Sequence, residues 1–245
     1  MTLKEKTDYL PFLITKNEAE QIFYQWLKTK YRRKKNLTTT YQIQSLAANY
    51  IPVYLITADA SAHYGGTKTI SKFNTESEEY EYDYIHLSDQ VEIKIIYEMI
   101  YAISHTQILK LTNIQRFDFD ELEELSDMSE DNFIEFDLSK EGAIDLFNEL
   151  VKTYLHDKAI SEVVDDGESL RIDLNPPKIK FERVYRAYIP VWEGVYTSEG
   201  KQFPFVINGR IGDIDGDYRR DYKMLQFFLI SVVLVIIILI LLQKV

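Results

Sequence analysis

The five residues Tyr50-Ile51-Pro52-Val53-Tyr54 recur, with one aromatic residue exchanged, as Tyr188-Ile189-Pro190-Val191-Trp192. Aromatic and β-branched residues around each proline predict that both stretches are β-strands. A proline has no N–H to donate to a neighbouring strand, so each stretch is predicted to lie at a sheet edge or at the start of its strand. The repeat indicates that the chain contains two related halves.

A segment with helical periodicity precedes each copy of the repeat. From about Asn17 to Lys35 and from about Lys140 to His156, apolar residues recur every three or four positions, which predicts two amphipathic helices. Thr15 or Asn17 would cap the first helix, and Ser139 the second. Predicted strands follow each copy: 51–60, 63–74, 79–87 and 91–113 after the first, with turns at 65–66 and 88–89, and 192–198 and 202–208 after the second, with turns at 198–200 and 208–209.

The shared order of helix, repeated strand and hairpins predicts an α+β protein with an internal duplication. Residues 1–113 and 138–222 would form two similar subdomains, each a helix packed on an antiparallel sheet. The acidic residues 114–137 would connect them. A single transmembrane helix, residues 224–242, is expected to follow the second subdomain.

The transmembrane prediction rests on the composition of the C-terminal residues. From Phe227 to Leu242 only Ser231 is not a hydrocarbon side chain, and the nineteen residues 224–242 match the ~30 Å core of a bilayer at ~1.5 Å per residue. A buried core helix or an oligomerisation coil is the alternative. Three basic residues (Arg219, Arg220, Lys223) precede the segment and only Lys244 follows it, which predicts a cell-membrane protein with a cytoplasmic N-terminal domain.

No pattern in the chain indicates catalytic or metal chemistry. The absence of cysteine excludes disulfides, cysteine-ligated zinc, iron–sulfur clusters and thiol catalysis. The chain has no phosphate-binding loop, dinucleotide fingerprint or nucleophile elbow, and its four histidines are not at metal-binding spacing. The carboxylates Asp213, Asp215 and Asp217 alternate as in a calcium loop, but Met224 occupies the position of the required glutamate. We therefore predict no catalytic residue, no cofactor and no metal site.

Basic residues cluster at the end of the first predicted helix: Lys28, Lys30, Arg32, Arg33, Lys34 and Lys35. Three interpretations are open: a solvated helix end that favours its own dipole, a contact with anionic lipid headgroups, or a contact with an acidic partner protein. Nucleic acid is not expected as a partner, because the chain carries a net charge of −11 and only Tyr31 interrupts the cluster.

The connector is the most acidic part of the chain, with ten carboxylates and no basic residue between Asp118 and Asp137. Apolar residues such as Phe119 and Leu122 interrupt the acids. The segment is therefore predicted either to pack on its own domain or to dock on a basic partner surface. The docking alternative would use Asp120, Glu121, Glu123 and Glu124.

Several stretches together resemble a bacterial family whose members usually carry an N-terminal zinc ribbon like that of transcription factor IIB. Members are often labelled replication-restart helicases. The similar residues cover most of 9–216: Leu10-Pro11-Phe12 before a helix with Ala19, Phe23 and Trp26, both repeated strands, Gly200-Lys201 before Phe203 and Phe205, Val206-Ile207-Asn208-Gly209, and Gly212. This chain lacks the ribbon cysteines, so the zinc of the family is not expected here. It also lacks the phosphate-binding loop that a helicase requires.

The resemblance implies a duplicated α+β domain and, for membrane-anchored relatives, an association with membrane-organising proteins of the SPFH (stomatin/flotillin-like) or phage-shock types. We expect a tail-anchored adaptor that presents a cytoplasmic domain for protein assembly at the membrane. Two alternatives are a membrane-bound enzyme with an unrecognised carboxylate site and a membrane tether for nucleic acid that acts through residues 28–35. A flat apolar patch or an open sheet edge, without a pocket, would favour the adaptor. A concave, aromatic-lined pocket with converging carboxylates would favour the enzyme, and a continuous basic face that joins residues 28–35 to other strands would favour the tether. The partner's identity and the oligomeric state are not predicted.

Overall fold

The computed structural model describes residues 7–30, 41–103, 114–125, 132–163 and 169–218. Within these ranges the protein is mixed α+β, as predicted, with two α-helices and an eight-stranded sheet. The elements in chain order are β1 (Thr7–Tyr9), α1 (Lys16–Lys30), β2 (Tyr41–Asn74), β3 (Glu79–Tyr101), the 3-10 turn η2 (Phe119–Glu121), β4 (Glu123–Glu124), α4 (Lys140–Val163), β5 (Ser169–Leu174), β6 (Lys178–Ser198), β7 (Lys201–Asn208) and β8 (Ile214–Gly216).

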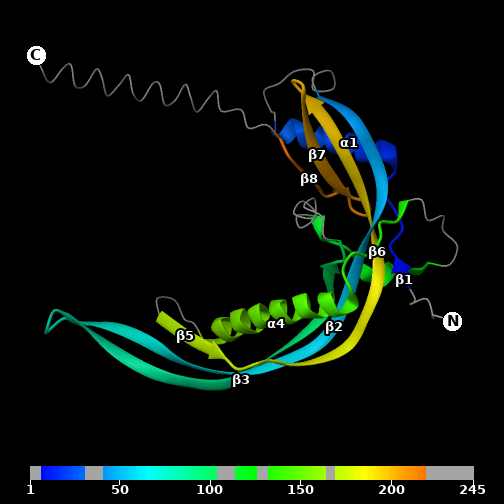
Figure 1. Cartoon of the computed structure of the whole chain (residues 1–245). Coiled ribbons are helices and arrows are strands. Elements are labelled where there is room, and N and C mark those ends of the chain that lie inside the picture. The colour runs from blue at the N-terminus through cyan, green and yellow to red at the C-terminus, as the bar shows by residue number, and fades with distance from the viewer. Residues whose placement is uncertain (1–6, 31–40, 104–113, 126–131, 164–168, 219–245) are drawn as a thin grey trace, which may run out of the picture.

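The strands β2 and β6 form the centre of the sheet and pair antiparallel from Tyr41↔Ser198 to Ser61↔Lys178. The hydrogen-bonded order is β3-β2-β6-β1-β4, with β5 beside β2, β7 beside β6, and β8 beside β7. Figure 1 shows the sheet as a long curved ribbon, with α1 near one end and α4 on the inner side of the bend. The two repeated stretches therefore pair with each other, since Ile51 lies opposite Ile189.

The predicted turns at 65–66 and 88–89 are wrong, because β2 and β3 continue through both. Gly65 pairs with Ser88 in register. A Cβ on Gly66 would collide with the backbone carbonyl of Arg171 in β5, so this glycine permits the close approach of a neighbouring strand. The chain reverses instead after Asn74, whose side-chain oxygen accepts a hydrogen bond from Glu76 N at 2.9 Å.

Pro52 lies in the interior of a central strand, not at an edge or a strand start, and pairs with Tyr188. Its carbonyl accepts a hydrogen bond from Ala102 N at 2.9 Å, but it has no N–H to return one. The Ala102 carbonyl instead accepts from Asp137 N (2.8 Å) and Leu138 N (3.2 Å). Because Pro52 has no N–H, the Ala102 carbonyl accepts instead from the residues that lead into α4.

Pro190 is used in the same way in the other half of the sheet. Its carbonyl accepts from Gly209 N at 2.9 Å. The Gly209 carbonyl then accepts from Leu13 N and Ile14 N, each at 2.9 Å. These two residues lead into α1, so each proline holds the start of one helix against the sheet.

Further contacts around the prolines match between the two halves. In each half an aromatic residue of one central strand donates to a carbonyl just before a helix, and a backbone amide from that same entry segment donates back to the same central strand. The matched hydrogen bonds are Trp192 Nε1 to Ile14 O (2.9 Å) with Tyr54 Oη to Leu138 O (3.1 Å), and Leu10 N to Tyr188 O (2.9 Å) with Ile134 N to Tyr50 O (3.1 Å).

Both helices begin with the predicted type of cap. Thr15 and Glu18 form a capping box, in which the Glu18 carboxylate accepts from Thr15 N at 2.8 Å and from Thr15 Oγ1 at 2.7 Å. Both hydrogen bonds lower the pKa of Glu18, and the one from the Thr15 backbone N–H has the larger effect. Ser139 Oγ accepts from Gly142 N at 3.1 Å and so caps α4. Helix α4 ends at Val163, beyond the predicted His156, because Ala159 continues its buried stripe.

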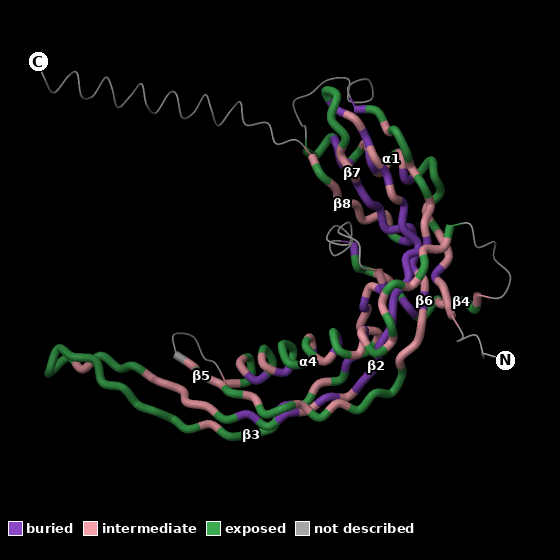
Figure 2. The backbone as a smooth tube through the Cα atoms, in the orientation of Figure 1, coloured by how far each residue is buried: buried purple, intermediate pink, exposed green. Residues whose placement is uncertain are grey.

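Three apolar clusters hold the elements together. Helix α4 packs on β2 and β3 through the buried residues Ala143, Phe147, Val151, Leu155 and Ala159. Helix α1 packs on β6 and β7 through Ala19, Phe23, Trp26 and Leu27. The third cluster lies between them around the repeated strands and includes Phe119 from the connector. Figure 2 shows the buried positions along β2, β6 and the inner helix faces, whereas the far end of the β2–β3 hairpin is exposed.

No helix in the described part of the chain is long and apolar enough to cross a membrane. The predicted transmembrane segment, residues 224–242, lies outside the described residues.

Candidate interaction surface beside helix α4

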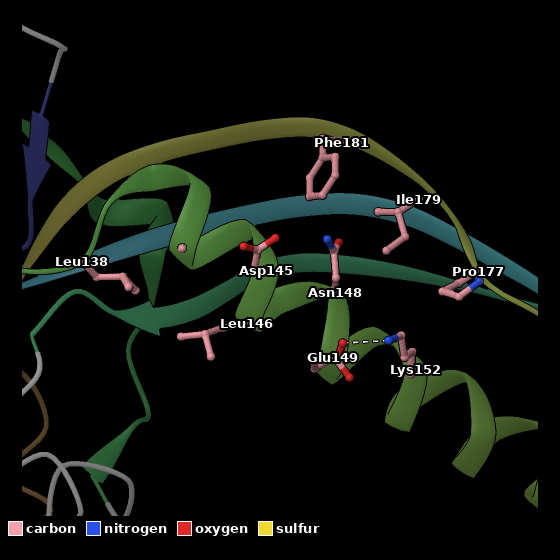
Figure 3. A pocket seen from close by; sticks show the side chains of 10 residues that line it. Leu138, Asp145, Leu146, Asn148, Glu149, Lys152, Pro177, Ile179 and Phe181 are labelled. Atoms are coloured by element: carbon pink, nitrogen blue, oxygen red, sulfur yellow. Dashed lines mark hydrogen bonds and ion pairs between the residues drawn. The ribbon is translucent and has the colours of Figure 1, made fainter.

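A groove of about 800 Å³ lies between α4 and β6 (Figure 3), and we call it the α4 groove. Ile179 and Phe181 project from β6 toward the helix. Leu146, at 51% exposure, and Phe181, at 37%, leave apolar surface open to solvent. The lining residues are Leu138, Gly142, Asp145, Leu146, Asn148, Glu149, Lys152, Pro177, Ile179 and Phe181.

The spacing of side chains on α4 explains why the groove has this lining. Residues that follow one another at intervals of four, from Ala143 to Ala159, face the sheet and are buried. The adjacent face, which includes Asp145 and Leu146, is turned toward the groove. Phe147 bridges the two faces, because its ring lies 5.7 Å from the ring of Phe181.

One edge of β6 borders the α4 groove and has no neighbouring strand in the described part of the chain. On that side β6 pairs with β1 at residues 186–188 and with β7 at residues 191–198. Within Lys178–Tyr185 the strand pairs only with β2, on the opposite side, with Glu182 left out of register at a bulge. We call this stretch the β6 edge. Its outward N–H and C=O groups are available to a further strand.

The charged residues of the groove come from one face of α4. Glu149 and Lys152 form an exposed ion pair at 2.7 Å, and such pairs contribute little to stability. On the other flank of α4, the Tyr154 hydroxyl donates to Glu98 at 3.2 Å. Burial raises the pKa of Glu98, and the hydrogen bond from Tyr154 partly opposes this. Within the described ranges no group of three or more His, Asp or Glu side chains could hold a metal ion.

The predicted basic cluster is described only in part. Lys28 and Lys30 lie exposed at the end of α1, while Arg32, Arg33, Lys34 and Lys35 fall outside the described residues. The Lys30 ammonium lies 5.0 Å from the ring centre of Tyr218, a cation–π distance. The basic end of α1 is therefore close to the point from which the chain continues toward 224–242.

The predicted acidic docking residues are partly engaged within the molecule. Glu121 forms an ion pair with Arg210, whose side chain is 5% exposed. Glu123 accepts a hydrogen bond from the Tyr9 hydroxyl at 2.9 Å, and with Glu124 it forms β4, which pairs with β1. Asp120 is exposed on the turn η2. The described part of the connector thus packs on its own domain, as the first of its two interpretations expects.

Neither the α4 groove nor the partners of Arg210 were foreseen from the sequence. The groove is formed by residues about thirty positions apart that no local pattern links. Arg210 donates to Pro11 O at 3.2 Å and pairs with Glu121, so its partners are 199 and 89 residues away. The only available signal was a single arginine inside an apolar, turn-rich stretch.

Comparison of the chain with protein-family models, with curated proteins and with solved structures finds no significant match.

Proposed function

We propose that this protein is an adaptor that binds an extended segment of a partner protein along the β6 edge, in the α4 groove. The observation that carries the proposal is the position of this unpaired edge beside an exposed apolar groove. Strand addition of this kind obtains affinity from backbone hydrogen bonds and specificity from pockets for alternate side chains. Leu146, Ile179 and Phe181 would contact the apolar side chains of the bound segment.

The molecule already contains one example of the proposed contact. Strand β1 pairs parallel with β6 through Thr7↔Arg186, Asp8↔Ala187 and Tyr9↔Tyr188, on the same side as the β6 edge. A bound segment would continue along the line that β1 occupies. Neither the enzyme nor the nucleic-acid alternative has comparable support in the described residues.

We propose that residues 224–242 hold the adaptor in the cell membrane with its folded domain in the cytoplasm. The position of Lys30 beside Tyr218 supports a contact of the basic cluster with anionic headgroups near this segment. The family resemblance supports a membrane-organising protein of the SPFH or phage-shock type as the partner.

We also propose that the fold arose by internal duplication, with α1-β2-β3 corresponding to α4-β6-β7. The matched proline, aromatic and helix-entry contacts of the two halves support this. So does the equivalence of the buried helix residues: Ala19, Phe23 and Leu27 correspond to Ala143, Phe147 and Val151. On this view the two copies pair through their repeated strands and share one sheet.

Photo-crosslinking in cells tests the adaptor proposal. With benzoylphenylalanine in place of Phe181, we expect a crosslink to a protein segment, identified by mass spectrometry. Leu146→Glu should lower its yield about tenfold or more, because it replaces an apolar contact of about 1.5–3 kcal/mol by a charge.

The matched control is Leu13→Glu, the same change at a residue that is also exposed but lies outside the groove. It should leave the yield unchanged. A crosslink to lipid only, or equal yields from both variants, would reject the groove as the binding site.

Deletion of residues 224–245 tests the membrane attachment. The described apolar clusters contain no residue beyond Tyr218, so the truncated protein should fold and move almost entirely to the soluble fraction. The full chain should remain with membranes after a carbonate wash. Retention of the truncated protein in the washed membrane would contradict the predicted anchor.

A further inference from the structure

The end of the β2–β3 hairpin, Ile70–Ile85, forms an arm with no helix or third strand beside it in the described residues. Strand β5 pairs with β2 only as far as Thr69, and beyond that point β2 has β3 as its neighbour. Figure 1 shows the arm extending away from the rest of the sheet. Two-stranded ribbons are marginally stable by themselves, so such an arm gains from burial against a partner.

One face of the arm carries an exposed aromatic stripe. Phe73, Tyr80, Tyr82 and Tyr84 are each more than half exposed. The three tyrosines alternate along β3 and so share a face, and Phe73 joins them because it lies directly opposite Tyr80. The Phe73 and Tyr80 rings meet edge to face at 5.2 Å. The stripe is larger than the scattered apolar residues of an ordinary surface.

The opposite face of β3 is acidic. Glu79, Glu81 and Asp83 alternate with the tyrosines, and Lys72 pairs with Asp83 at 3.1 Å. From Ile70 to Ile85 a single lysine is present against five carboxylates. A strand added to the outer edge of β3 would therefore place alternate side chains beside tyrosines and beside carboxylates.

We infer that the outer edge of β3, Glu79–Ile85, binds an extended segment of a partner protein with Lys or Arg at alternate positions. The basic side chains would pair with Glu79, Glu81 and Asp83. Aliphatic or Arg side chains on the other face would cover the tyrosine rings, which attract cations. This site is separate from the α4 groove and does not depend on the function proposed for the groove.

Two other occupants are disfavoured by the charges of the arm. If two copies paired antiparallel through this edge around Tyr82, Glu81 of one copy would lie opposite Asp83 of the other. Like charges directly opposite each other destabilise a strand pair, which protects edges from self-association. Anionic lipid headgroups would be repelled by the five carboxylates.

Peptide binding to the full chain in non-ionic detergent tests the inference. The probes are two labelled nine-residue peptides, one alternating lysine with valine and the other alternating glutamate with valine. We expect the lysine peptide to bind at least about tenfold more tightly, with an affinity that falls as salt is added. The double variant E81Q/D83N should weaken its binding roughly three- to tenfold, the range for two exposed charge pairs.

The control E76Q/E78Q removes the same charge from the turn at the tip of the arm and should change binding less than about twofold. Tyr82→Thr should weaken lysine-peptide binding, and Leu146→Glu should leave it unchanged. Equal affinity for the two peptides, or equal effects of the two double variants, would overturn the inference. Two further outcomes would overturn the inference: a homodimer that Tyr82→Thr abolishes, and binding to anionic vesicles that Tyr82→Thr abolishes.

Discussion

Phe147→Ala is expected to lower the free energy of unfolding by about 3–5 kcal/mol, the usual cost of removing a buried phenylalanine. Phe147 has no exposed surface, and its ring packs on the sheet with the ring of Phe181 5.7 Å away. Its removal would leave a cavity under the middle of α4, where two long strands and the helix offer little room to collapse. Urea unfolding followed by far-ultraviolet circular dichroism measures the loss.

The neighbouring residue is the control, because Leu146 is half exposed. Leu146→Ala should cost less than about 1 kcal/mol. Tryptophan fluorescence adds a second test, since Trp26 and Trp192 both lie in the cluster around α1 at the other end of the sheet. If Phe147→Ala shifts both signals together, the two ends unfold as one unit. A shift in circular dichroism alone would show that they unfold separately.

Asn208→Ala should also destabilise the protein by about 3–5 kcal/mol, because it leaves several buried backbone groups without partners at about 1–3 kcal/mol each. Asn208 is fully buried at the end of β7. Its side chain donates to Ile114 O and Arg116 O, both at 2.9 Å, and accepts from Arg210 N at 2.8 Å and Ile211 N at 3.2 Å. It therefore fastens the connector to the turn after β7.

Asn74→Ala serves as the control for this network. Asn74 also accepts hydrogen bonds from two backbone amides, but it does so at the exposed tip of the arm, where water can replace the side chain. Its replacement should cost at most about 1 kcal/mol. Equal losses for the two variants in urea unfolding would show that the connector is not held by the Asn208 side chain.

Local features of the fold were predictable because their causes are local. The two helices, their caps and the hairpin at Glu199-Gly200 follow from spacing and turn chemistry, and both turn residues have positive φ. The pairing of β2 with β6 was not predictable in this way. Register depends on contacts between residues far apart in the chain, such as Ile51 and Ile189. The prediction of a turn at Gly65 and Gly66 failed for the same reason. A glycine is required at position 66 because the backbone of Arg171, in the distant strand β5, approaches it closely.

The interaction surfaces were harder to predict than the fold. The alternation of tyrosine and carboxylate from Glu79 to Tyr84 is visible in the sequence, but a stripe of this kind is buried in most sheets. In the described residues the stripe is exposed because no helix or second sheet covers this face of the arm. Conversely, Glu121 lies in an acidic segment that was predicted to pack on its own domain or to dock on a partner, and its partner Arg210 is brought to it by the fold.

The continuity of β2 and β6 has a mechanical consequence. Strand β2 runs without a break from Tyr41, in the same apolar cluster as Tyr218, to Asn74 at the end of the arm. A single strand, and not a linker between separate bodies, therefore joins the arm to the region around Tyr218. A partner that pulls on the arm of a membrane-held molecule would load β2 along its length. The hydrogen bonds between β2 and β6 would then carry the load together in shear, instead of opening one at a time. Such a molecule would transmit tension from its partner to the bilayer, where two domains on a flexible linker would swivel.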